Sequence, residues 1–234
     1  MIFYFVRMIL HGGFIMIKAI IFDMDGLLID SEMISYKCYR DFLKEHGYTF
    51  TLKEYIQDYP GKTLIKSLNF IQEHYHLDFK IEDGIQKFRE LEDIHIKKDG
   101  VPLKKGALEL LSYLKQNKYK TIVATSSRKE RAINLLESLQ VLSYFDHFVF
   151  GSEVKHSKPA PDIFLKAREK LDVLPQEALV LEDSEAGIDS AYQAQIPVIC
   201  IPDLKKPDDV HKERTTCLLN SLEEVIKYIE KSNA

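Results

Sequence analysis

The sequence has few cysteines, no excess of positive charge and no long apolar run, and each absence excludes a class of protein. Its three cysteines, Cys38, Cys200 and Cys217, are scattered over 234 residues. They match neither a zinc-site spacing nor a disulfide framework, so we expect a cytoplasmic protein kept in a reducing compartment. The formal net charge of −4 gives no indication of a basic surface, so we expect no nucleic-acid partner.

The N-terminal stretch 1–10 is apolar apart from one arginine, but it is too short to span a bilayer. It also lacks the basic start and small-residue cleavage site of a signal peptide. We therefore expect no membrane among the partners, and a membrane pump is excluded. Met16 directly precedes the first predicted strand, so we expect residues 1–15 to be an extension from a misassigned start. A monomer is the default expectation for the oligomeric state.

The most informative segment that is present begins at Lys18, where a run of Ile and Phe ends abruptly in Asp23, Met24, Asp25 and Gly26. The run predicts a buried strand with the two aspartates at its carboxyl end, where open α/β sheets bind ligands. Gly26 permits a sharp turn, and the chain must bend after Asp23 for both carboxylates to reach one ligand. An Asp-Gly pair alone is also common in ordinary turns, so the rest of the chain must decide.

Strands and helices alternate along most of the chain, which predicts an α/β fold with a doubly wound parallel sheet, a Rossmann-like core. The segment between the first two strands contains only helical patterns, so we expect a small all-helical cap inserted there. The predicted core is 16–29 with 102–234, and the predicted cap is 30–101. The predicted strands are Ala19–Asp23, Thr121–Ala124, His147–Phe150, Ala178–Leu181 and Pro197–Ile201.

Polar residues follow four of these strands, and parallel strands bring their carboxyl ends to one edge of a sheet. Besides the aspartate pair, they are Thr125, Ser126 and Ser127, then Lys158, then Glu182 and Asp183. Two like charges about 4 Å apart repel by roughly 4 kcal/mol at an effective dielectric of about 20, so such a site binds a cation or raises a carboxyl pKa. Mg²⁺ fits where a phosphate completes its shell. The pattern therefore predicts metal-assisted phosphoryl transfer through a carboxylate nucleophile.

These motifs, in this order, resemble the haloacid dehalogenase superfamily, and within it the capped phosphatase and β-phosphoglucomutase branch. The resemblance is carried by Asp23–Gly26 with 30–32, by 157–162 and by 181–188, and it covers the chain from Met16 onward. It implies that Asp23 is the nucleophile. It implies that Asp25 is the general acid and base, and that the Asp25 backbone carbonyl binds the metal.

The resemblance assigns the remaining predicted site residues as well. Thr125 and the Ser126 amide would hold phosphoryl oxygens, and Lys158 would neutralise the charge on the nucleophile and the phosphoryl group. Asp183 would bind Mg²⁺, and Glu182 would bind it directly or through water, so that the metal ligands would be Asp23, Asp25, Glu182 and Asp183. Lys62, which follows a glycine in the predicted cap, is a candidate for binding the distal charge of a substrate, and an ordinary solvated lysine is the favoured alternative.

The expected function is a Mg²⁺-dependent phosphatase acting on a small phosphorylated metabolite, either a sugar phosphate or a nucleotide. A β-phosphoglucomutase-type mutase is the first alternative, but Ser35 and Leu64 stand where the resembling mutases carry His and Arg. A non-catalytic protein that binds a phosphorylated ligand is the second alternative. Dehalogenation is disfavoured because those relatives lack the second aspartate.

One glycine lies inside a predicted helix near the site. Gly187 costs that helix roughly 1 kcal/mol relative to alanine. We expect close backbone packing beside the site to require it.

Overall fold

The structure of the protein is a computed structural model that describes residues 16–233, in two compact units. Within these residues, one unit is 16–29 together with 103–233, and the other is Asp30–Pro102. We call them the core and the helical insert. The predicted extension, residues 1–15, lies outside the described residues. Over residues 16–233, no helix is both long enough and apolar enough to cross a membrane.

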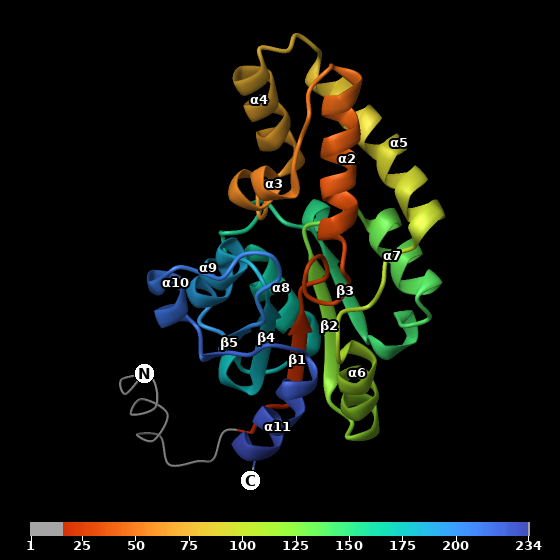
Figure 1. Cartoon of the computed structure of the whole chain (residues 1–234). Helices are drawn as coiled ribbons and strands as arrows, with labels where there is room; N and C mark the ends of the chain where they lie inside the picture. The colour runs from red at the N-terminus through yellow and green to blue at the C-terminus, as the bar shows by residue number, and fades with distance from the viewer. Residues whose placement is uncertain (1–15, 234) are drawn as a thin grey trace. The chain divides into compact units, whose positions relative to one another are not determined.

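A single six-stranded sheet forms the centre of the core, and every strand pair in it is parallel. The strand order is β3-β2-β1-β4-β5-β6, so β1 lies in the middle (Figure 1). This confirms the predicted α/β fold. The strands are β1 (Ala19–Phe22), β2 (Lys120–Thr125), β3 (His147–Phe150), β4 (Ala178–Glu182), β5 (Val198–Cys200) and β6 (Cys217–Leu218).

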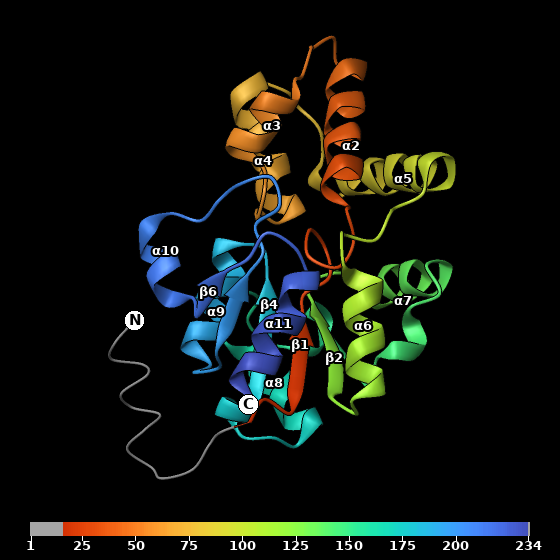
Figure 2. The ribbon, with the colours of Figure 1, turned by 60° about the horizontal axis from the view of Figure 1, so that its bottom comes forward.

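Helices cover both faces of the sheet, as a doubly wound fold requires. The side chains of Ala19 and Ile21 face α8 and α9, which pack side by side on one face. Figure 2 shows α6 and α11 on the opposite face. The core helices are α6 (Ala107–Gln116), α7 (Lys129–Ser138), α8 (Asp162–Leu171), α9 (Glu185–Gln193), α10 (Asp209–Arg214) and α11 (Glu223–Ser232), with 3-10 turns η1 (Leu142–Tyr144), η2 (Gly151–Glu153) and η3 (Pro175–Glu177).

The register of the central strands decides which strand ends lie together. Phe22, the last residue of β1, is level with Val123 of β2 and with Leu181 of β4. Asp23 and Glu182 therefore leave the sheet side by side, and the Asp23 amide donates to the Leu181 carbonyl oxygen over 3.0 Å. The edge strand β6 was not predicted, because two partly exposed residues are too short to show an alternating pattern.

The helical insert contains four helices: α2 (Glu32–Glu45), α3 (Leu52–Asp58), α4 (Leu64–Tyr75) and α5 (Ile81–Asp99). A capping box opens α3, with the Glu54 amide donating to Thr51 Oγ1 over 3.3 Å and the Thr51 amide donating to Glu54 Oε2 over 2.7 Å. α2 packs along α5, and buried rings fill the space between the two helices. Among them, the ring centroids of Tyr39 and Phe88 lie 4.6 Å apart.

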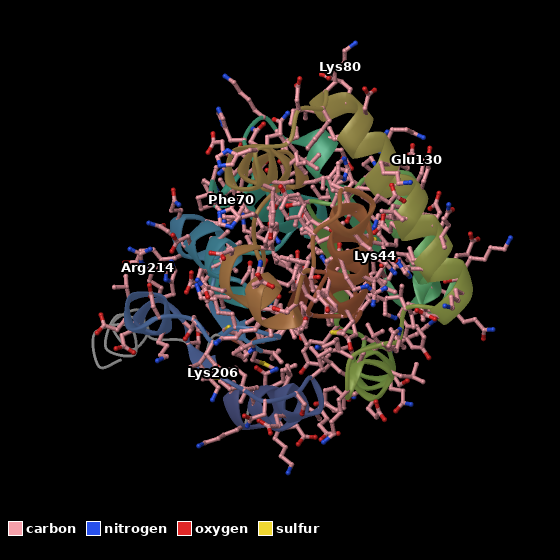
Figure 3. All side chains as sticks on the ribbon, turned by 45° about the horizontal axis from the view of Figure 1, so that its top comes forward. Lys44, Phe70, Lys80, Glu130, Lys206 and Arg214 are labelled. Carbon is pink, nitrogen blue, oxygen red and sulfur yellow. The ribbon has the colours of Figure 1, made fainter. Side chains whose placement is uncertain are left out.

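Charged side chains project outward from the helices of each unit (Figure 3). In the insert, Lys44 and Lys80 are exposed, and in the core, Glu130 and Lys206 are exposed. Each unit therefore has an apolar interior of its own and a charged surface.

Phe164 of α8 is completely buried against the sheet, whereas the next residue, Leu165, is 40% exposed. We expect Phe164→Ala to lower the free energy of unfolding by about 3–5 kcal/mol, because it leaves a cavity in a packed core. Leu165→Ala is the matched control and should cost much less. Urea unfolding of the two variants measures the difference, and equal losses would contradict this account of the core.

Candidate active site

The aspartate pair lies where β1 ends and the chain turns. Gly26 adopts a φ of +81°, and its amide donates to the Ile29 carbonyl oxygen over 3.0 Å. A Cβ at this position would lie 2.3 Å from Asp183 Oδ2, so only glycine permits the close approach. The turn therefore both redirects the chain after Asp23 and makes room for an acidic side chain from the end of β4.

Lys158 joins two buried carboxylates at this edge. Its Nζ lies 2.5 Å from Asp23 Oδ1 and 2.5 Å from Glu182 Oε1. The side chains of Lys158 and Asp23 are 8% and 9% exposed, and that of Glu182 is 1% exposed. The three predicted site residues, contributed by the ends of β1 and β4 and by the loop before α8, thus form one buried charge cluster.

The loop that carries Lys158 is fixed at several points. The Asp162 carboxylate accepts from the His156 amide over 3.1 Å and lies 3.2 Å from His156 Nδ1. From α9, Ser190 Oγ donates to the Ala160 carbonyl oxygen over 2.7 Å, and Gln193 donates to the Pro159 carbonyl oxygen over 2.8 Å. These contacts give the motif around Lys158 a structural purpose, since they aim the ammonium at the site.

Glu182 is held as tightly as Lys158. Its Oε2 accepts from the backbone amides of Asp183 and Ser184, over 2.9 and 3.0 Å, and from Ser184 Oγ over 3.0 Å. A Cβ at Gly187 would lie 1.8 Å from Glu182 Cδ. The expectation of close packing at Gly187 is therefore confirmed, and the group that occupies the space is the Glu182 carboxylate.

Burial dominates the electrostatics of this cluster. Loss of solvation raises the pKa of Asp23 to about 7, and the neighbouring Glu182 carboxylate works in the same direction, against the attraction of Lys158. Burial alone would lower the pKa of Lys158, but the carboxylates of Asp23 and Glu182 outweigh it and hold that pKa above its ordinary value. Lys158 therefore carries its positive charge at neutral pH, and it faces two acidic groups.

Oxygen atoms of Asp23, Glu182 and Asp183 lie within 4.8 Å of one another, close enough to hold one metal ion. An all-oxygen set of this kind suits a hard divalent cation such as Mg²⁺. The Asp25 side chain is not a member of the group, and its predicted metal contact was through the backbone carbonyl. The donor set therefore fits the expected cofactor.

The Asp25 carboxylate has a different set of partners. Arg131 Nη1 lies 2.9 Å from Asp25 Oδ1 and 3.0 Å from Oδ2, and Ser127 Oγ donates to Oδ2 over 2.7 Å. The sequence reasoning included Ser127 among the polar residues after β2 but gave it no role, and it missed Arg131. The two residues are four apart, a spacing that places side chains on one side of a helix start, and this was the available signal.

Thr125, at the end of β2, is buried beside Ser127, one of the partners of the Asp25 carboxylate. Its Oγ1 accepts from the Ser127 amide over 3.0 Å. The neighbouring Ser126 is exposed. The structure thus places Thr125 and Ser126 at the same sheet edge as the aspartates, and their phosphoryl-binding roles stay predictions.

Lys62 belongs to the helical insert, where its Nζ lies 4.7 Å from the Phe70 ring centroid, and its role in substrate binding stays a prediction. Within the core, Lys104 Nζ lies 2.6 Å from Asp203 Oδ1, an ion pair that sequence reasoning did not find. It ties the segment that follows the insert to the end of β5.

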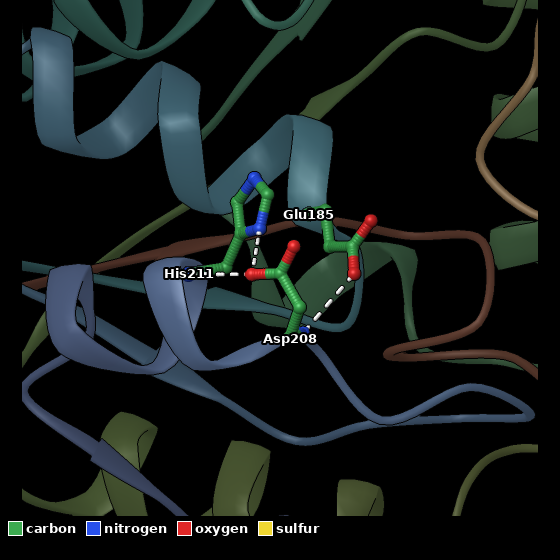
Figure 4. A group of neighbouring side chains, drawn as sticks. All are labelled: Glu185, Asp208 and His211. Carbon is green, nitrogen blue, oxygen red and sulfur yellow. Dashed lines mark hydrogen bonds and ion pairs between the residues drawn. The ribbon is translucent and has the colours of Figure 1, made fainter.

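A second group of candidate metal ligands, Glu185, Asp208 and His211, lies between α9 and α10 (Figure 4). The Asp208 amide donates to Glu185 Oε1 over 3.2 Å, and Asp208 Oδ1 accepts from the His211 amide over 2.9 Å while lying 2.6 Å from His211 Nδ1. Asp208 is the exposed N-cap of a six-residue helix. These contacts account for the group as a link between the two helices.

A sequence model described as haloacid dehalogenase-like hydrolase matches residues 20–201. The chain belongs to the haloacid dehalogenase-like hydrolases. A phosphorylated carbohydrates phosphatase from Thermotoga maritima is 34% identical over 186 residues, which cover 76% of this chain and 82% of that protein. Hexitol phosphatase A from Escherichia coli is 29% identical over 210 residues, which cover 89% and 93% of the two chains.

Solved structures place the protein in the phosphatase and β-phosphoglucomutase-like branch of the haloacid dehalogenase-like hydrolases. The crystal structure of β-phosphoglucomutase from Clostridium difficile matches with a TM-score of 0.74 and 25% identity, covering 93% of this chain and 97% of that one. The resemblance drawn from the motifs is therefore confirmed at the level of the superfamily and of its phosphatase and β-phosphoglucomutase-like branch.

Lys158→Ala would leave the Asp23 and Glu182 carboxylates buried without their shared cation. Removing one partner of a buried ion pair typically costs about 3–5 kcal/mol, and we expect a loss of that size in the free energy of unfolding at pH 8. Lys155→Ala removes an exposed lysine from the same loop and is the control. If the two variants unfold at the same urea concentration, Lys158 does not balance the buried charge.

Gly187→Ala should destabilise the protein although alanine favours a helix. Overpacking costs about 1–3 kcal/mol, and the helix gains about 1 kcal/mol, so with a clash this close we expect a net loss of about 2 kcal/mol. The displaced Glu182 carboxylate should also weaken Mg²⁺ binding. Thermal unfolding and Mg²⁺ titration calorimetry test both effects, and a variant that is more stable and binds Mg²⁺ normally would refute the packing argument.

Proposed function

We propose that the protein is a Mg²⁺-dependent phosphatase that hydrolyses a small phosphorylated metabolite, a sugar phosphate or a nucleotide, through an aspartyl phosphate on Asp23. The single observation that carries this proposal is the buried group of Asp23, Lys158 and Glu182 in a chain of this family. The names of two relatives, phosphorylated carbohydrates phosphatase and hexitol phosphatase A, support a sugar phosphate as the substrate.

The proposed reaction begins with the Asp23 carboxylate, which attacks phosphorus while the bond to the leaving oxygen breaks. Asp25 gives a proton to that oxygen, and the substrate alcohol departs. Asp25 then takes a proton from the water that attacks the aspartyl phosphate, which releases inorganic phosphate and restores the Asp23 carboxylate. Lys158, beside Asp23, stabilises the negative charge that both steps bring into the site.

Asp23, Glu182 and Asp183 are the side chains that would hold Mg²⁺, together with the backbone carbonyl of Asp25. When bound, the ion supplies positive charge that offsets the acidic side chains and the phosphoryl oxygens. Thr125, with the Ser126 amide, would hold the remaining phosphoryl oxygens. Each of these roles agrees with the oxygen-rich, largely buried surroundings of the site.

A sugar phosphomutase is the second candidate, and the likeness to the Clostridium difficile enzyme favours it. Ser35 and Leu64 stand at the positions where the resembling mutases have His and Arg, and this difference disfavours a mutase. A protein that binds a phosphorylated ligand without turning it over is the third candidate, and the same assay separates all three.

Phosphate release should be measured over a panel of sugar phosphates and nucleotides with Mg²⁺. We expect Asp23→Asn to lower kcat by about 10³-fold or more, because the amide cannot form the aspartyl phosphate. Removing Mg²⁺ with a chelator should give a comparable loss that added Mg²⁺ reverses. Phosphate release by Asp23→Asn at the wild-type rate would exclude the proposed mechanism.

The same samples distinguish the alternatives. With β-glucose 1-phosphate and a bisphosphate primer, conversion to glucose 6-phosphate without phosphate release would establish the mutase. Binding of phosphorylated compounds with neither reaction would establish the non-catalytic protein.

A further inference from the structure

The Asp25 carboxylate is enclosed by two side chains that the proposed function has not used. Arg131 Nη1 contacts both Asp25 oxygens, at 2.9 and 3.0 Å, and Ser127 Oγ donates to one of them over 2.7 Å. Arg131 Nη1 also donates to Ser127 Oγ over 2.8 Å. The three side chains form a closed triangle of hydrogen bonds, so each of them restricts the other two.

This triangle is anchored to the rigid part of the core. Arg131 projects from α7, whose Ala132, Leu135 and Leu136 are buried. Ser127 is held through its amide, which donates to the buried Thr125 Oγ1 at the end of β2. The Arg131 side chain is only 15% exposed. The carboxylate of Asp25 is thus oriented from β2 and α7.

The two aspartates of the motif are consequently held from opposite sides of β1. Asp23 contacts Lys158, which also contacts Glu182 at the end of β4. Asp25 contacts Ser127 and Arg131, which follow β2. The outer torsion of an aspartate side chain has a broad energy minimum, so its carboxylate turns freely unless partners fix it. A proton-transfer group needs a fixed orientation, since a misplacement of about 1 Å can cost about 100-fold in rate.

We propose that Arg131 is a positioning residue, which works with Ser127 to fix the Asp25 carboxylate in the orientation needed for proton transfer to the leaving oxygen and from water. The inference rests on the proposed phosphatase function. Arg131 acts through Asp25 and does not bind the phosphoryl group.

The first test replaces the arginine with a neutral side chain of similar length. We expect Arg131→Met to lower kcat by about 10- to 100-fold, the size of effect that misorientation produces, with KM changed less than about twofold. Arg131→Lys should recover part of the loss, since one ammonium can reproduce the contacts made by a single nitrogen. Arg128→Met, which removes an exposed arginine at the N-cap of α7, is the control and should match the wild type.

A second readout reports on Asp23 alone. Beryllofluoride with Mg²⁺ mimics a phosphoryl group on an aspartate, and its binding can be followed by fluorine-19 NMR. Arg131→Met should bind it with wild-type affinity if the substitution affects only Asp25. Lost or weakened binding would show general damage to the fold or to the phosphoryl site and would overturn the positioning role.

A double-mutant cycle supplies the decisive comparison. If Arg131 acts through Asp25, Arg131→Met should change the residual rate of Asp25→Asn by less than about twofold. An undiminished effect in the Asp25→Asn background would overturn the inference, and so would full activity of Arg131→Met.

The inference can fail while the proposed function stands. In that case the Asp25→Asn variant is nearly inactive, whereas the Arg131→Met variant is as active as the wild type. A wild-type rate that neither Asp23→Asn nor Asp25→Asn changes would instead overturn the proposed function, and the inference with it.

Discussion

The buried ion cluster of Asp23, Lys158 and Glu182 is the interaction on which the arrangement of the rest of the core depends. Taking charges out of water costs several kcal/mol for each ion, so a buried cluster persists only where other groups complete its hydrogen bonds. The register of β1 and β4 brings the two carboxylates side by side, two backbone amides hold Glu182, and α9 holds the loop that delivers Lys158. Gly187 is required because the Glu182 carboxylate occupies the space of a side chain.

The cluster also explains why a divalent cation and a phosphoryl group suit this site together. One ammonium faces two buried carboxylates, and Asp183 adds a third acidic group at the same edge. A cation would relieve the excess of negative charge, and burial together with the nearby Glu182 carboxylate raises the pKa of Asp23 in the same sense. In the proposed function, such a cation would let the edge accept an anionic phosphoryl group.

Most of the core could be predicted from the sequence, because Asp23, Lys158 and Glu182 each follow a recognisable buried strand or lie in a recognisable loop motif. The parallel sheet then dictates their convergence at one edge. Strand β6 could not be predicted, since Cys217 and Leu218 are too few to show periodicity. Arg131 was missed because its role depends on the direction of α7 relative to Asp25, which is set by tertiary packing.

Trapping the covalent intermediate tests the central claim most directly. Rapid acid quench of the protein during turnover, followed by reduction of any acyl phosphate with borohydride and peptide mass spectrometry, identifies the residue that carried the phosphoryl group. The account predicts that Asp23 is the residue converted to homoserine, and only when substrate and Mg²⁺ are both present. Modification at another carboxylate, or none at Asp23 during rapid turnover, would contradict it.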